Sequence, residues 1–267
     1  MFYLRKTLFV CLALATLCLG SAKGYTLIVV PGAQATSEGN SSNPFPFFVN
    51  AFDDLSSQRY QQVYAASSFS ALIGPSLITQ ILFRPDAGDG SAFASTLSDV
   101  QINLSTTSAA HDALSFKFAS NVGANDTIVY ARGPLPLASS DTPGPGGSRN
   151  FDIIINLTTP FLYDPSQGNL LLDVRNFGGG GTTIFDAQST LGGDAISRIY
   201  TFTANGANSL TADGGDTSGL VTAFNFAPSA PTAAVPEPTT MLLLGTGVAG
   251  VAAKVWRRKK VQADEEA

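Results

Sequence analysis

The chain has 267 residues and a formal net charge of −5, with 44% hydrophobic and only 13% charged residues. Between residues 25 and 235, seven basic residues stand against sixteen acidic ones, a net of −9, because the other basic residues lie at the two ends. So acidic a segment argues against binding to nucleic acid or anionic lipid. Few Lys and Glu residues among many Gly, Ser, Thr and Asn favour strands over helices.

Residues 1–24 have the pattern of a secretory signal peptide. Arg5 and Lys6 form a positive start, residues 7–19 are apolar, and small residues follow. We therefore expect an exported chain that begins at Lys23 or Tyr25. Cys18 raises the alternative of a lipid-modified cysteine, which Leu17 before it disfavours because such sites take a small residue there.

Both cysteines, Cys11 and Cys18, lie in this first segment. The exported part therefore has no disulfide, no thiolate metal site and no cysteine nucleophile.

Alternating apolar and polar residues predict strands in the central segment. Val100, Ile102 and Leu104 interleave with polar residues, and the pattern recurs over residues 151–157. Further strands are predicted at 26–30, 77–84, 113–118, 127–131, 169–177, 182–185, 198–203 and 222–226. Residues 58–66 fit a helical turn or a strand. Turns are predicted at 85–88, 141–147, 164–165, 178–181 and 213–215, from their Gly, Pro and Asp content.

About ten strands without a long helix predict an all-β fold, an antiparallel β-sandwich or jelly-roll-like domain over residues 25–226. Residues 227–235 are rich in Pro, Ala and Thr and are expected to form a stalk.

Aspartates beside glycines are the candidate metal ligands. Short carboxylates in tight loops suit calcium, which takes six to eight oxygen ligands. The candidates are Asp86 and Asp89 in one loop and Asp213 and Asp216 in another. Aspartate is also a common turn former, because its side chain bonds to its own backbone. These aspartates are therefore either calcium ligands or turn formers.

Catalytic motifs are sparse. His111 is the only histidine, and no G-x-S-x-G elbow accompanies it, so we expect no serine hydrolase and no enzyme with a recognisable catalytic constellation. The fifteen aspartates leave open a pair of carboxylates of the kind that hydrolyses glycosides. The glycines at 245, 247 and 250 match a dinucleotide-binding pattern but lie in an apolar run with no βαβ unit, so they indicate a small-residue helix face.

The C-terminal segment combines a helix breaker, an apolar run and a basic stop. Pro236, Glu237 and Pro238 cannot continue a helix. Residues 241–256 form a predicted transmembrane helix, and an acidic tail follows at 261–267. The cytoplasmic stop consists of Lys254, Arg257, Arg258, Lys259 and Lys260.

Together, residues 236–260 resemble the PEP-CTERM sorting signal of Gram-negative bacteria. The resemblance implies recognition by an exosortase, export to the cell surface or the medium, and transient anchoring in the inner membrane by the C-terminal helix. The segments 83–86, 159–165 and 169–177 are similar to an uncharacterised β domain that recurs in such proteins, a resemblance that carries no known activity.

We therefore expect a non-enzymatic surface or extracellular protein without an obligatory cofactor. The resemblance implies an association with exopolysaccharide or biofilm matrix. The alternatives are a carbohydrate-active enzyme or calcium-dependent glycan-binding module on the same scaffold, and a single-pass membrane protein that is never cleaved.

Overall fold

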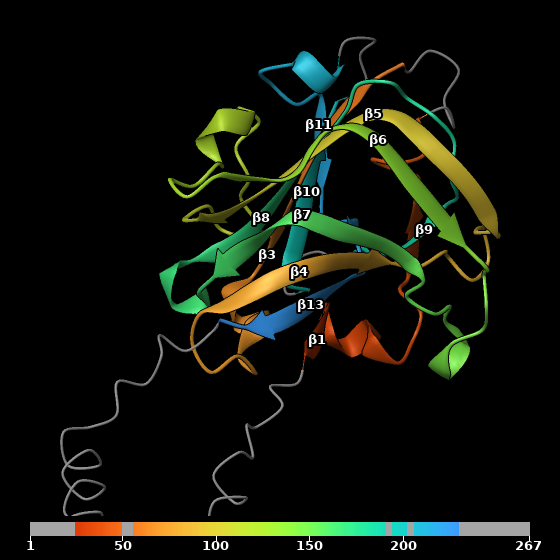
Figure 1. Cartoon of the computed structure of the whole chain (residues 1–267), viewed down its shortest axis with the longest axis horizontal. Coiled ribbons are helices and arrows are strands. Elements are labelled where there is room, and N and C mark those ends of the chain that lie inside the picture. The colour runs from red at the N-terminus through yellow and green to blue at the C-terminus, as the bar shows by residue number, and fades with distance from the viewer. Residues whose placement is uncertain (1–24, 50–55, 191–193, 202–205, 230–267) are drawn as a thin grey trace, which may run out of the picture. The chain divides into compact units, whose positions relative to one another are not determined.

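The computed structural model describes residues 25–49, 56–190, 194–201 and 206–229 (Figure 1). The predicted signal peptide, the sorting segment 236–260 and the helix 241–256 lie outside these residues. Among the described residues, no helix has both the length and the apolar character needed to cross a membrane.

A four-stranded antiparallel sheet holds both ends of the described chain. Its strands, in spatial order, are β1 (Thr26–Val30), β13 (Thr222–Pro228), β4 (Ser76–Phe83) and β7 (Ile153–Tyr163). β13 extends two residues past the predicted end of the domain. Figure 1 shows β13, β4 and β7 side by side.

A six-stranded antiparallel sheet is the larger layer. Its order is β11 (Gly214–Asp216), β10 (Ile196–Tyr200), β3 (Gln58–Tyr64), β8 (Asn169–Asn176), β5 (Phe93–Thr107) and β6 (Thr127–Ser139). The long strand β5 pairs with β6 through several register shifts. Such bulges bend a strand and increase its twist.

A small third sheet joins β12 (Gly219–Leu220), β9 (Phe185–Gln188) and β2 (Ser41–Asn43). The helical elements among the described residues are short 3₁₀ turns. These are η2 (Gly32–Ala35), η4 (Ala66–Phe69), η5 (Phe118–Ser120), η6 (Pro145–Gly147), η7 (Pro165–Gln167) and η8 (Gly206–Asn208).

All three sheets contribute to one hydrophobic core. Val100, Ile102 and Leu104 are fully buried, as their alternation predicts. Phe47, Phe83 and Phe185 pack as tilted and edge-to-face rings whose centroids lie 5.5–6.0 Å apart. The predicted antiparallel, all-β class is confirmed.

Residues 58–64 are a strand, the second of the two alternatives that the sequence left open there. Two other local predictions are corrected. Residues 113–118 form a loop with one isolated bridge from Lys117, because Phe118 turns into a buried 3₁₀ element. The predicted turn at 213–215 is mostly strand β11, where a side chain on Gly215 would come within 2.8 Å of Ile199.

Candidate functional site

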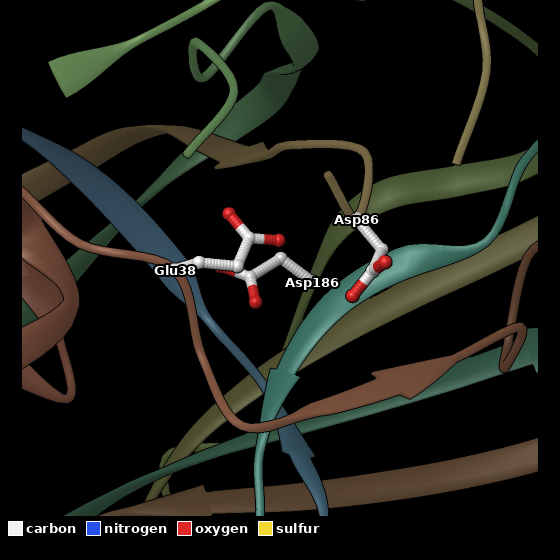
Figure 2. A group of neighbouring side chains, drawn as sticks. All are labelled: Glu38, Asp86 and Asp186. Carbon is white, nitrogen blue, oxygen red and sulfur yellow. The ribbon is translucent and has the colours of Figure 1, made fainter. Parts of the chain in front are cut away.

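Three carboxylates from distant parts of the sequence meet at one end of the third sheet. Glu38 lies in the loop after η2, Asp86 in the turn after β4, and Asp186 on β9. One oxygen from each lies within 4.8 Å of the others (Figure 2). We call these residues the carboxylate cluster.

Backbone amides orient the cluster. Asp86 Oδ1 accepts hydrogen bonds from Gly88 N–H (2.9 Å) and Asp89 N–H (2.7 Å). Glu38 Oε1 accepts one from Ala87 N–H (2.8 Å), and Asp186 Oδ1 accepts one from Gly39 N–H (2.9 Å).

Gly39 is needed at this position. A Cβ there would lie 2.0 Å from the carbonyl oxygen of Ala187, so only glycine lets the loop approach β9 this closely.

Arg84 supplies the positive charge of the site. Its Nε donates to Asp186 Oδ2 (2.7 Å), and its Nη2 lies 2.6 Å from the same oxygen. Nη2 also donates to the carbonyls of Gln34 and Ser37, and the guanidinium lies over the Phe151 ring. Arg84 therefore joins the end of β4 to β9 and to the loop after β1.

Burial changes the protonation of the cluster. Desolvation raises the pKa of Asp186 to about 7 and also raises the pKa of Glu38. The neighbouring charge of Glu38 likewise raises the pKa of Asp186. Glu38 Oε2 receives no protein donor, so it is the oxygen available to carry a shared proton.

The arrangement acts chiefly as a structural cross-link. Asp186 is only 1% exposed and both of its oxygens accept hydrogen bonds, so a substrate does not reach it. The Arg84 guanidinium already balances Asp186, and Asp86 Oδ1 is taken by two amides. A cation at this cluster would have to use the remaining oxygens of Glu38 and Asp86.

The predicted calcium ligands fall into two different settings. Asp89 Oδ2 accepts the hydroxyl of Ser42 at 2.9 Å, in the same turn as Asp86. Asp216 forms a two-pronged ion pair with Arg198 (2.7 and 3.1 Å) and also accepts the Tyr200 hydroxyl. Asp213 donates its N–H to the carbonyl of Tyr200. The structure thus groups Asp86 with Glu38 and Asp186, two residues that the sequence analysis did not single out.

His111 lies in a turn beside Asp112, with Nε2 3.2 Å from its carboxylate. Ser197 donates its hydroxyl to the backbone carbonyl of His111 and not to the imidazole. Within the described part of the chain, these two residues therefore do not form a nucleophile–base pair.

A shallow groove of about 180 Å³ lies at the outer edge of the six-stranded sheet. Its walls include Asp112, Phe116, Gly215 and Thr217, with Arg198 and Asp216 beside them. The Phe116 side chain is 52% exposed. Gly215 has no side chain to fill the space in front of the ring, since a Cβ there would lie 3.6 Å from Phe116 Cζ.

A second groove, of about 360 Å³, is lined by residues 31–34, Ser68, Gln188, Thr190, Asp194 and Ala195. Burial raises the pKa of Asp194 in its wall. This groove has no aromatic side chain in its lining.

The described residues define a class: an antiparallel β domain with an arginine-bridged carboxylate cluster and an aromatic groove at one sheet edge. The family model of the PEP-CTERM protein-sorting motif matches residues 234–259. The chain therefore carries a PEP-CTERM sorting motif, which implies recognition by an exosortase, export and association with the cell surface. No curated protein and no solved structure matches it.

Proposed function

We propose that the chain is a non-enzymatic surface protein whose β domain holds a neutral polysaccharide of the extracellular matrix. The sorting motif supports the location. The exposed Phe116 ring in the groove at the sheet edge supports the ligand class.

Phe116 supplies what a sugar ring needs from a protein surface. The apolar C–H face of a pyranose packs against an aromatic ring, and its hydroxyls need polar partners at the rim. Asp112 and Thr217, which carry a carboxylate and a hydroxyl, also line the groove. A volume of about 180 Å³ is below the ~300 Å³ of pockets that enclose drug-sized ligands, so it suits one unit of a longer chain.

Charge favours a neutral glycan over an acidic one. Asp112, Asp216 and Arg198 line the groove, a local net charge of −1, and residues 25–235 carry a net charge of −9. A uronic acid unit would therefore meet repulsion both locally and from the whole domain.

We further propose that residues 241–256 anchor the protein in the inner membrane until an exosortase acts on Pro236, Glu237 and Pro238, with the basic cluster 254–260 on the cytoplasmic side.

The groove is tested with Phe116→Ala in the exported protein. Removing the stacking surface should weaken binding to a neutral glucan about tenfold, equivalent to ~1.4 kcal/mol. Leu210→Ala removes a side chain that is 80% exposed outside the groove and should leave binding unchanged. Isothermal titration calorimetry with neutral and uronic acid oligosaccharides measures both. Equal affinity of wild type and Phe116→Ala for the glucan would contradict the proposal.

The meeting of three carboxylates, Glu38, Asp86 and Asp186, is the observation that favours the rival carbohydrate-active or calcium-dependent reading. Two further measurements separate the readings. Release of reducing sugar that Asp86→Asn abolishes would support an enzyme. Glycan binding that a chelator abolishes and calcium restores would support a calcium-dependent module.

A further inference from the structure

The outward face of the four-stranded sheet is uncharged. No Asp, Glu, Lys or Arg occurs in β1, β13, β4 or β7, although the strands of the six-stranded sheet carry seven charged residues. These are Arg59, Asp99, Arg132, Asp173, Arg175, Arg198 and Asp216. The charge of this acidic domain is therefore distributed unequally between its two large sheets.

The same face exposes large apolar side chains. Ile28, Ile81, Ile155 and Phe224 point into the core, so their strand neighbours point outward. Leu27 is 54% exposed, Ile154 42% and Leu162 52%, and Tyr25, just before β1, is 69% exposed. An apolar surface of this kind, interrupted by polar groups, is typical of an interaction site.

A ladder of side-chain amides crosses the middle of the face. Asn225 Nδ2 donates to Gln80 Oε1 (2.8 Å), and Gln80 Nε2 donates to Asn156 Oδ1 (2.7 Å). The three residues are neighbours in register on β13, β4 and β7. Within the described residues, the ladder ends in a donor on Asn156 and an acceptor on Asn225.

We propose that a second copy of this chain docks on this face, sheet against sheet. Two copies with a net charge of −9 repel each other, and the uncharged sheet is the surface on which close contact adds least repulsion. A two-fold axis parallel to the strands through Gln80 places the Asn156 donor of each copy over the Asn225 acceptor of the other. The ladder is thus self-complementary, as an isologous interface requires.

The size of the face sets the expected strength. With the axis through Gln80, the strands β13, β4 and β7 of one copy cover those of the other. Three strands about 4.8 Å apart and roughly seven residues long give an overlap of the order of 300 Å². A stable complex buries about 800 Å² per partner, so this contact belongs to the weak class. Neither of the two grooves described above lies on the face, so a flat partner fits it better than a single glycan chain. The inference is independent of the glycan proposal, because the groove residues take no part in it.

Analytical ultracentrifugation of the exported protein, released from producing cells and studied from micromolar to millimolar concentration, tests the inference. We expect a reversible dimer. The double variant Leu27→Asp/Leu162→Asp should raise its dissociation constant at least tenfold, because it places two carboxylates at Leu162 between the copies and two at Leu27 on the rim of the contact. Ile128→Asp is the matched control, since Ile128 is 48% exposed on β6 of the other sheet. It should leave the dimer unchanged.

Cross-linking in the whole chain gives a second measurement that does not disturb the apolar rows. The exported part has no cysteine, so Gln80→Cys introduces the one thiol, close to the proposed axis. A short bis-maleimide should link two copies of Gln80→Cys on the cell surface and not two copies of Ile128→Cys. A wild-type chain that stays monomeric throughout overturns the inference. So does a dimer that Leu27→Asp/Leu162→Asp leaves intact, and so does an uncharged face that binds only vesicles or glycan.

Discussion

Two buried arginine–aspartate pairs hold distant segments of this domain together. Arg84 binds Asp186, and Arg59 binds Asp173 through Nε (3.1 Å) and Nη2 (2.6 Å). All four side chains are less than 10% exposed. Removing one partner of such a pair typically costs about 3–5 kcal/mol, because it leaves a buried charge without compensation. Arg84 connects the end of β4 to β9 and to the loop after β1, and Arg59 connects β3 to β8.

The carboxylate cluster should make stability depend on pH in an unusual direction. The pKa of both Asp186 and Glu38 is raised, so the folded state holds a proton that the unfolded state releases. This contribution is complete below about pH 4, the pKa of an unfolded carboxyl, and is lost as the pH rises through about 7. One proton corresponds to at most ~1.4 kcal/mol per pH unit.

Glu38→Gln should reduce the loss of unfolding free energy per pH unit, since an amide at this position donates a hydrogen bond to Asp186 without titrating. Chemical denaturation of the exported protein at pH 5, 6, 7 and 8 measures it. Asp99→Asn is the control: Arg132 lowers the pKa of Asp99, so that group titrates below this range. An unchanged slope in Glu38→Gln would mean that the proton is not held at this pair.

At the scale of the element, β3 is unusual because all of its residues are buried, polar ones included. Gln61 binds Asp173 and the carbonyl of Phe118 on one face of the strand. On the other face, Gln62 accepts from Leu220 N–H (2.8 Å) and donates to Leu220 C=O (2.9 Å). The Gln62 amide thus pairs with β12 as a neighbouring strand would.

Gln62→Leu should therefore detach β12. The change removes the acceptor of the Leu220 N–H and of the buried Tyr60 hydroxyl, while the Leu220 C=O keeps the Thr222 hydroxyl as a donor. The expected loss is roughly 2–3 kcal/mol of unfolding free energy. Gln101→Leu, which replaces a half-exposed side chain bonded to Asn103, should cost less than about 0.5 kcal/mol. Thermal denaturation of both variants measures the two losses of stability. Equal losses would show that the amide pairing with β12 adds nothing specific.

Alternation of side chains was enough to predict strands such as β5 and β7, because each has one face in the core and one outside it. It could not predict β3, because that strand is buried on both faces. Its glutamines Gln61 and Gln62 contact different polar groups on the two faces, so apolar and polar residues do not alternate along the strand. Alternation also failed for 113–118, where loop packing around Phe118 overrides an apolar pattern. The carboxylate cluster was out of reach, since Glu38, Asp86 and Asp186 meet only through the third sheet. The lone glutamate between residues 25 and 235 was the one signal for it.

At the scale of the whole molecule, the chain divides into two compact units at Ser229. The first holds the β domain, and the second contains the whole sorting motif. The sorting motif thus lies in a segment that contributes no strand to the described sheets. The sorting motif could be found from the sequence alone, because proline and basic residues act locally and need no tertiary partner.

The division predicts that sorting and folding are separable. Deleting residues 236–267 should leave the melting temperature of the exported domain within about 1 °C, because the sheets end at Pro228. The same deletion should abolish exosortase-dependent sorting.

Replacing Arg257, Arg258, Lys259 and Lys260 with Gln tests the basic stop. This variant should release full-length precursor or invert the tail. Glu237→Ala is the sharper test, since two prolines present this carboxylate in a fixed direction to a basic or hydrogen-bonding partner. Intact mass of the surface-released protein reports the cleavage in every variant. If Glu237→Ala is cleaved and sorted at the wild-type rate, then recognition does not depend on that carboxylate, and the tail acts as an ordinary membrane anchor.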